Sequence, residues 1–164
     1  MRFYKGIITV VFSALLSVFI IYPFLHELGH ALALLSVKCK IVSFSVFPLP
    51  FVLCEGSLTD YQTAIVAVSG NLLPVAMLLL PAPKNLFFRS MIMMMGTVSI
   101  VFCVVSVVGT AVPLPYDDIS IVSPEYMSLA VIVNLLCICV AMFKILSLKF
   151  LNFLTNYLSE ASVS

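Results

Sequence analysis

Two histidines and a glutamate stand within five residues, in the run His26-Glu27-Leu28-Gly29-His30. Residues four apart lie on the same face of a helix, so both imidazoles can reach one metal ion. Glu27 follows the first histidine directly, where it can accept a proton from a water molecule in the same site. The pattern H-E-x-x-H on a helix is typical of zinc hydrolases, and both histidines of the chain belong to it.

A catalytic zinc ion takes three protein ligands and keeps one position open, so a third side chain is needed. Asp117 and Asp118 follow a proline-broken segment, residues 113–116, on the same side of a four-span arrangement as the histidines. We expect Asp118 to be the third ligand because it leads into the apolar Ile119. Asp117 is the alternative, and the aspartate that is not a ligand could accept a hydrogen bond from a histidine ring. Taken alone, the aspartate pair would also fit a solvated loop or a helix N-cap.

The next apolar stretch contains Gly70, Asn71 and Pro74. A buried asparagine costs free energy unless its amide is hydrogen-bonded. Two roles fit this one. In the first, the helix opens locally, and Asn71 and Pro74 bind the substrate backbone or an oxyanion. In the second, the Asn71 amide forms a hydrogen bond between two helices, and the pattern favours neither.

The composition is that of a membrane protein. The 164 residues are 63% hydrophobic and 9% charged, and the mean hydropathy is +1.24. A soluble domain is about 45–50% apolar and about 25% charged. We therefore predict a multi-pass integral membrane protein. The net charge of +1 provides no basic field, so we expect no nucleic-acid partner.

The predicted fold class is an all-α polytopic membrane protein, with one integral membrane domain over residues 1–164. Runs of about 20 apolar residues are long enough to cross the hydrocarbon of a bilayer. Four such spans are predicted, at about 6–36, 62–80, 88–112 and 126–143. We expect Pro23 to kink the first span just ahead of the histidines. Residues 144–158 are predicted to form an amphipathic helix along the membrane interface.

Residues 40–59 differ from the spans. They combine β-favouring side chains with Pro48 and Pro50, which exclude a regular helix. We expect a short β-hairpin here, inserted after the first span and dipping toward the bilayer. Non-helical backbone at that depth must be buried in protein or line a cavity. The edge of such a strand could pair with an extended substrate segment.

Two of the five cysteines, Cys39 and Cys54, flank this hairpin and could form a disulfide if it faces an oxidising compartment. The other three lie in apolar spans, where we expect small buried hydrophobic side chains. These are Cys103, Cys137 and Cys139.

Lysine and arginine are distributed unevenly between the two sides of the four-span arrangement. Lys38 and Lys40 lie on the side of the histidines, and the remaining basic residues lie on the other. The positive-inside rule then places both termini in the cytoplasm and the histidine motif toward the outer face.

Three pieces of the chain resemble the site-2 protease family of intramembrane zinc metalloproteases. They are the run from His26 to His30, with Ala31 after it, the run Ser69-Gly-Asn-Leu-Leu-Pro74, and an aspartate at a later helix junction. The resemblance covers roughly residues 6–125. It implies a short helical bundle in which two histidines and one aspartate hold zinc inside the membrane.

Carried over residue by residue, the resemblance implies that His26 and His30 bind one zinc ion and that Glu27 is the base. Asn71 resembles the asparagine of the family's N-x-x-P element, and the hairpin resembles its membrane-dipping β region. The chain departs from the family in having Asp117-Asp118-Ile119 where an Asp-Gly motif is usual. In the family the motif-bearing helix usually ends near the cytosol, opposite to what the charge distribution predicts.

The expected function is hydrolysis, by a zinc metalloendopeptidase, of a peptide bond in or near a transmembrane segment of a membrane protein or peptide. The alternative is a non-catalytic membrane scaffold or binding protein that retains the protease fold. A metal transporter would need ligands along a path, whereas the acidic residues here gather at one end. Beyond the substrate, the partners are the lipid bilayer and, to complete the walls of so small a bundle, another copy of the chain.

Overall fold

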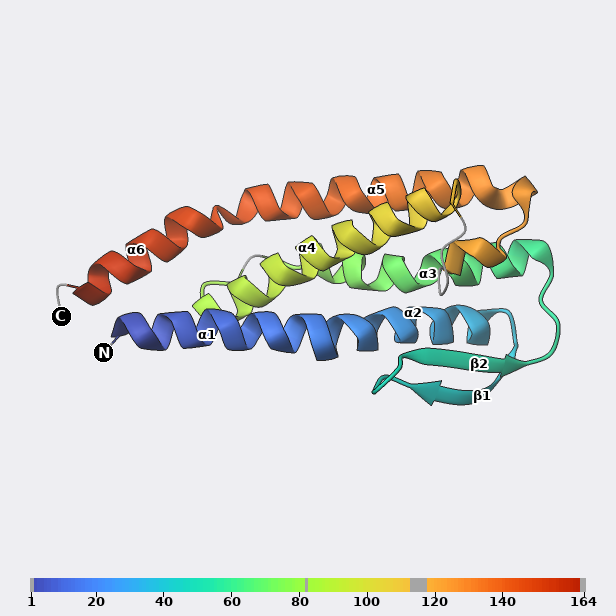
Figure 1. The fold of residues 1–164 in the computed structure, drawn as a ribbon, viewed down its shortest axis with the longest axis horizontal. Coiled ribbons are helices and arrows are strands. Elements are labelled where there is room, and N and C mark those ends of the chain that lie inside the picture. The colour runs from blue at the N-terminus through green and yellow to red at the C-terminus, as the bar shows by residue number, and fades with distance from the viewer. Residues whose placement is uncertain (1, 82, 113–117, 163–164) are drawn as a thin grey trace.

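The computed structural model describes residues 2–81, 83–112 and 118–162. Long helices lie side by side in a bundle, and a two-stranded hairpin lies against one end of it (Figure 1). The N- and C-terminal ends of the chain lie together at the opposite end. Within the described residues, four helical segments are long and apolar enough to cross a membrane, as the composition predicts.

The first span is helical from Arg2 to Ser36. It consists of α1, Arg2–Leu16, then a π-helical turn, Ser17–Ile21, then α2, Tyr22–Ser36. Pro23 lies in the first turn of α2 and has no N–H to donate to the preceding turn. The expected irregularity ahead of the histidines therefore takes the form of a π-helical turn.

The second span is α3, Asp60–Leu78. Its first turn is stabilised by a capping box in which Thr59 and Gln62 satisfy each other's backbone N–H groups. Pro74 lies inside the helix, and α3 runs unbroken through this segment, so the local opening that one of the two roles of Asn71 requires is not observed. Packing on both sides holds the helix together despite the missing N–H of the proline.

The third span is α4, Leu86–Gly109, and the fourth begins with α5, Pro124–Leu148. Lys149 adopts a left-handed conformation, with φ of 44°, and ends α5; α6, Phe150–Ser162, follows. The helix of the fourth span therefore ends at Leu148 and not near residue 143. The helix that follows it starts at Phe150 and not at residue 144. The amphipathic α6 contacts α1, and its place along a membrane interface stays a prediction.

The hairpin is formed by β1, Lys40–Ser45, and β2, Phe51–Glu55, which pair antiparallel as predicted. An exposed ion pair between Lys40 Nζ and Glu55 Oε2, 3.0 Å apart, marks its base. The strands run alongside α2, back toward the middle of the bundle (Figure 1). Among the described residues this sheet has two strands, so the outer edge of each has no strand partner there.

The helices α2 and α3 pack closely at a pair of glycines. A Cβ atom on Gly29 would overlap the backbone carbonyl of Ser69, and one on Gly70 would overlap the imidazoles of α2. Small residues let two helix backbones approach in this way. The close approach brings α3 next to the face of α2 that carries the histidines.

Candidate metal centre

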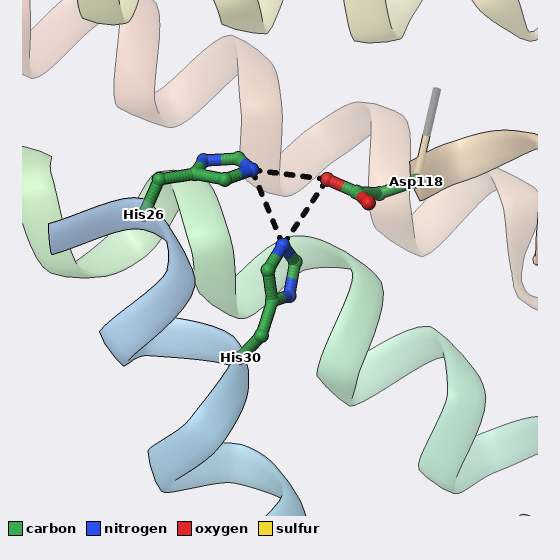
Figure 2. Close-up of side chains that lie close together, drawn as sticks. All are labelled: His26, His30 and Asp118. Carbon is green, nitrogen blue, oxygen red and sulfur yellow. Dashed lines mark hydrogen bonds and ion pairs between the residues drawn. The ribbon is translucent and has the colours of Figure 1, made fainter. Parts of the chain in front are cut away.

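Three side chains converge where α2 passes the 3₁₀ turn Asp118–Ile121 (Figure 2). The Nε2 atoms of His26 and His30 lie 3.2 Å apart, and each is 3.1 Å from Oδ2 of Asp118. The two histidines are one helical turn apart on α2, and the aspartate is about ninety residues further along the chain. The three donor atoms form a near-equilateral triangle, an arrangement that could hold a metal ion.

A backbone contact fixes the tautomer of His30. Its Nδ1 atom lies 2.7 Å from the carbonyl oxygen of Val66, which can only accept, so this nitrogen carries the proton and donates. In the neutral ring, Nε2 then presents a lone pair to the carboxylate oxygen of Asp118. Two electron-rich atoms at hydrogen-bond distance require a cation or a proton between them. A hydrogen bond that Nδ1–H donates to a backbone carbonyl is the usual way in which a metal-binding histidine is oriented.

His26 is held by aromatic neighbours. Its ring stacks on Tyr22, with centroids 6.0 Å apart, and lies beside Phe102, with centroids 5.8 Å apart. Its Nδ1 atom is buried and has no hydrogen-bond partner among the described residues, whereas Nε2 points to Asp118. The ring is therefore positioned by packing, and its polar interactions are concentrated on the side of the donor triangle.

Asp118 lies between spans, at a half-buried position. Burial alone would raise the pKa of its carboxyl group. When both imidazoles are protonated, the Nε2–H groups of His26 and His30 donate to the carboxylate, and this outweighs burial and holds its pKa below the usual range. The carboxylate is thus ionised at neutral pH and able to bind a cation. Asp117, the alternative ligand, lies outside the described residues.

Gly70 on α3 leaves the space that the two imidazoles occupy. A Cβ atom there would lie 2.6 Å from Cε1 of His30 and 2.7 Å from Cε1 of His26. Carbon atoms in contact are about 3.5–4.0 Å apart, so any side chain at this position would displace the rings. Gly70 is a site residue that the sequence pattern alone does not identify as one.

Glu27 is buried on α2 and lines a cavity of about 530 Å³ together with His30 and Asp118. The facing wall is formed by the end of the hairpin loop and by β2, from Pro50 to Cys54. Apolar side chains of α2, α3 and the 3₁₀ turn complete the lining. The Glu27 carboxylate, the triangle of possible metal ligands and one strand of the hairpin therefore border the same space.

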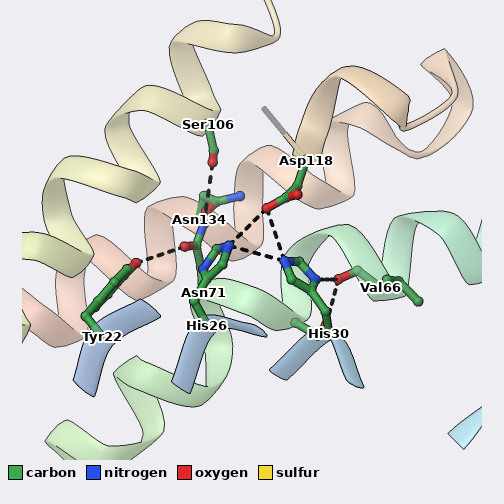
Figure 3. A network of polar contacts seen from close by, with 9 residues as sticks. Tyr22, His26, His30, Val66, Asn71, Ser106, Asp118 and Asn134 are labelled. Atoms are coloured by element: carbon green, nitrogen blue, oxygen red, sulfur yellow. Dashed lines mark hydrogen bonds and ion pairs between the residues drawn. The ribbon is translucent and has the colours of Figure 1, made fainter. Parts of the chain in front are cut away.

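The amide of Asn71 is occupied by other helices (Figure 3). Its Oδ1 atom accepts from Tyr22 Oη at 3.2 Å, and its Nδ2 atom donates to Asn134 Oδ1 at 2.8 Å and to Ser106 Oγ at 3.5 Å. Asn134 in turn donates to the carbonyl of Ala130. This network joins α2, α3, α4 and α5, and a buried asparagine is satisfied by it.

The sequence leaves two roles open for Asn71, substrate binding and hydrogen bonding between helices. The structure shows the second: the Asn71 amide forms interhelical hydrogen bonds. Asn71 and Pro74 are both buried, and neither lines the cavity beside Glu27. Substrate binding by Asn71 and Pro74 therefore stays a prediction, and no contact with the cavity supports it. Asn134 and Tyr22 were not identified from the sequence, although an asparagine within the apolar stretch of α5 is itself a signal of a buried polar contact.

Comparisons of the chain with protein-family models, with curated proteins and with solved structures return no match. The function must therefore be inferred from the site itself. Two histidines and an aspartate could hold a metal ion, and a carboxylate that is not part of the triangle lines the same cavity.

Proposed function

We propose that this protein is an intramembrane zinc metalloprotease, which hydrolyses a peptide bond in or near a transmembrane segment. The observation that carries the proposal is the convergence of His26, His30 and Asp118 in a cavity that Glu27 also lines. Neither the metal-binding group nor the carboxylate would be enough alone. Together they are the parts that metal-assisted hydrolysis needs.

The spacing of the donor atoms supports zinc. Bonds of about 2.0–2.1 Å at tetrahedral angles place two ligand atoms about 3.3 Å apart. The three separations here are 3.1, 3.1 and 3.2 Å. Two imidazoles and one carboxylate are also a donor set that zinc accepts in hydrolases, and three protein ligands leave a fourth position for water or substrate.

In this proposal each residue has a defined task. The zinc ion, when bound, supplies the positive charge that makes a water molecule acidic and polarises a carbonyl group. Glu27 accepts the proton of the attacking water and returns it to the leaving amine nitrogen. His30 keeps its orientation through the carbonyl of Val66, and Asp118 contributes the negative charge that balances the ion.

The substrate would enter as an extended strand. The residues from Phe51 to Cys54 line the cavity, and the outer edge of β2 has no strand partner among the described residues. Backbone hydrogen bonds to such an edge hold a peptide with little dependence on its side chains. The apolar lining suits a segment that comes from a membrane span and has unwound locally.

The test compares metal content with turnover. Wild-type protein and the variants H26A, D118A and E27Q are purified and reconstituted in phosphatidylcholine vesicles with a panel of labelled single-span peptides. We expect about one zinc per chain in wild type and in E27Q, a loss of zinc in H26A and D118A, and cleavage by wild type alone. New peptide termini are identified by mass spectrometry.

Cleavage that persists in E27Q would refute the proposed role of Glu27. Zinc bound stoichiometrically without cleavage of any peptide by wild type would favour the alternative, a non-catalytic scaffold that retains the metal centre. Bound metal by itself does not separate these two functions, whereas turnover that depends on Glu27 does.

A further inference from the structure

Two cysteines meet at the base of the hairpin. Cys39 follows the last turn of α2, where its N–H donates to the carbonyl of Leu34 at 2.9 Å, and Cys54 lies in β2. The strand register pairs Ile41 with Cys54 and Lys40 with Glu55. Side chains alternate along a strand, so Cys39 and Cys54 lie on the same face as diagonal neighbours.

Sγ of Cys39 donates to the carbonyl oxygen of Glu55, the residue after Cys54, at 3.3 Å, and both thiols are free in this structure. The hydrogen bond with the Cys39 thiol, with a smaller contribution from burial, raises the pKa of Cys54 to about 11. Gly56 lies next to Cys39 and has no side chain to separate the pair; a Cβ atom there would be 4.0 Å from the Cys39 sulfur. Both cysteines belong to the apolar cluster that joins the hairpin to α2 and α3.

The position of this pair connects it to the cavity. Cys54 lines the cavity that also contains Glu27 and His30. Cys39 is anchored to the end of α2, the helix that carries both histidines. A covalent bond between them would fix one wall of the cavity to the helix that forms the opposite wall.

We propose that Cys39 and Cys54 are a site of reversible disulfide formation that fixes the hairpin to α2. The oxidant is a disulfide compound, such as oxidised glutathione or a thiol–disulfide exchange protein. Six of the eight basic residues lie toward the other end of the bundle and two, Lys38 and Lys40, lie beside the hairpin, so the positive-inside rule places the hairpin on the side where such oxidants are abundant.

The reaction proceeds in two exchange steps. The half-buried Cys54 meets the oxidant first, and its thiolate attacks one sulfur, forming a mixed disulfide and releasing one thiolate. The thiolate of Cys39 then attacks the Cys54 sulfur and releases the second. Two cysteines are oxidised, one disulfide compound is reduced by two electrons, and the two protons end on the released thiols.

The chain contains its own matched control. Cys103 and Cys137 also interact as a thiol pair, between α4 and α5, but their exposed fractions are 0% and 3%. Each pair shares an apolar cluster, whereas access for an oxidant is limited to the pair at the hairpin, where Cys54 is half-buried. We therefore expect one pair to react and the other to stay reduced.

The experiment treats the purified full chain with oxidised glutathione, alkylates the remaining thiols with N-ethylmaleimide, and maps the digested peptides by mass spectrometry. We expect a Cys39–Cys54 linked peptide in wild type and in C103S. In C39S we expect a glutathione adduct on Cys54 and no link. Dithiothreitol should restore full alkylation of both cysteines.

The disulfide itself does not depend on the proposed proteolysis; only its effect on access to the cavity rests on that function. Alkylation of Cys39 and Cys54 to the same extent before and after oxidation would overturn the inference, as would a link between Cys103 and Cys137 in their place. A protein that forms the expected link and cleaves no peptide would refute the proposed function alone.

Discussion

A single methyl group on α3 should strongly weaken metal binding. In G70A the new Cβ atom would lie 2.6 Å from His30 and 2.7 Å from His26. Normal carbon contacts need about 3.5 Å, so the ring of His26 must move by about 0.8 Å and that of His30 by about 0.9 Å. Ligand distances in a metal site are held to within about 0.2 Å, which makes this displacement several times larger than the tolerance.

We expect the affinity for zinc to fall by about 100-fold or more, the size of effect that misplacing site groups by such distances produces. The helix itself should not suffer, because alanine is favoured over glycine in a helix interior by about 1 kcal/mol. If G70A loses the metal but keeps its helix content, the loss is therefore caused by displacement of the imidazoles and not by unfolding. The measurements are zinc content after competition with a chelator, circular dichroism, and the absorption spectrum of the cobalt-substituted protein.

The matched control is G96A on α4. A Cβ atom at Gly96 would lie 3.0 Å from Cγ1 of Ile145, a side chain whose far end can move aside. We expect this variant to retain zinc like wild type. Equal zinc affinity and an unchanged cobalt spectrum in G70A would show that α3 does not approach the imidazoles as described, and the geometry of the centre would then be wrong.

Three further predictions test separate parts of the structure. D118N removes the negative charge that faces both imidazoles, so it should weaken zinc binding by about 100-fold or more. D60N, in the first turn of α3, should leave zinc binding unchanged. Competition with a chelator measures the zinc affinity of both variants. N134A should lower the free energy of unfolding by about 1–2 kcal/mol in a denaturant titration, because Asn71 Nδ2 loses its 2.8 Å partner, yet zinc should be retained. The pKa of Cys54 is raised to about 11, so only a small fraction of this thiol is thiolate at neutral pH. The rate at which Cys54 is alkylated should therefore rise with each pH unit until the pH reaches about 11. A rate that levels off near pH 8 would contradict this prediction.

The parts of the fold that follow from local composition were predicted well. Long apolar runs indicate spans, and the part of the chain that the structure describes has four helical segments of that kind. Prolines and β-favouring residues after the first span indicate the hairpin, and β1 and β2 form it. These features depend on properties of neighbouring residues, which a sequence displays directly.

The group of possible metal ligands was predicted in part for the same reason. His26 and His30 are one helical turn apart, so a helix is enough to bring them together. Asp118 could be selected only by its side of the bundle and by its apolar neighbour. The structure brings its carboxylate to 3.1 Å from both rings, a contact that depends on the tertiary fold.

What the sequence did not predict depends on packing between helices. A proline in a span indicates a break, yet α3 remains helical through Pro74 because its neighbours hold it. The left-handed residue Lys149, where α5 ends, has no glycine or proline to mark it. Asn134 and Tyr22 meet Asn71 from two other helices, and no spacing along the chain relates the three.

The segment Ser69–Pro74 serves two purposes that its sequence does not separate. Successive residues of a helix point in directions about 100° apart, so Gly70 and Asn71 face different neighbours. Gly70 faces the imidazoles and leaves room for them, whereas Asn71 faces Tyr22 and Asn134 and ties α3 to α2 and α5. A metal site built from α2 and a distant turn needs both functions, because the rings require space and the helices around them require a fixed register. This explains why the structure places Asn71 beside the centre without placing its amide in the cavity.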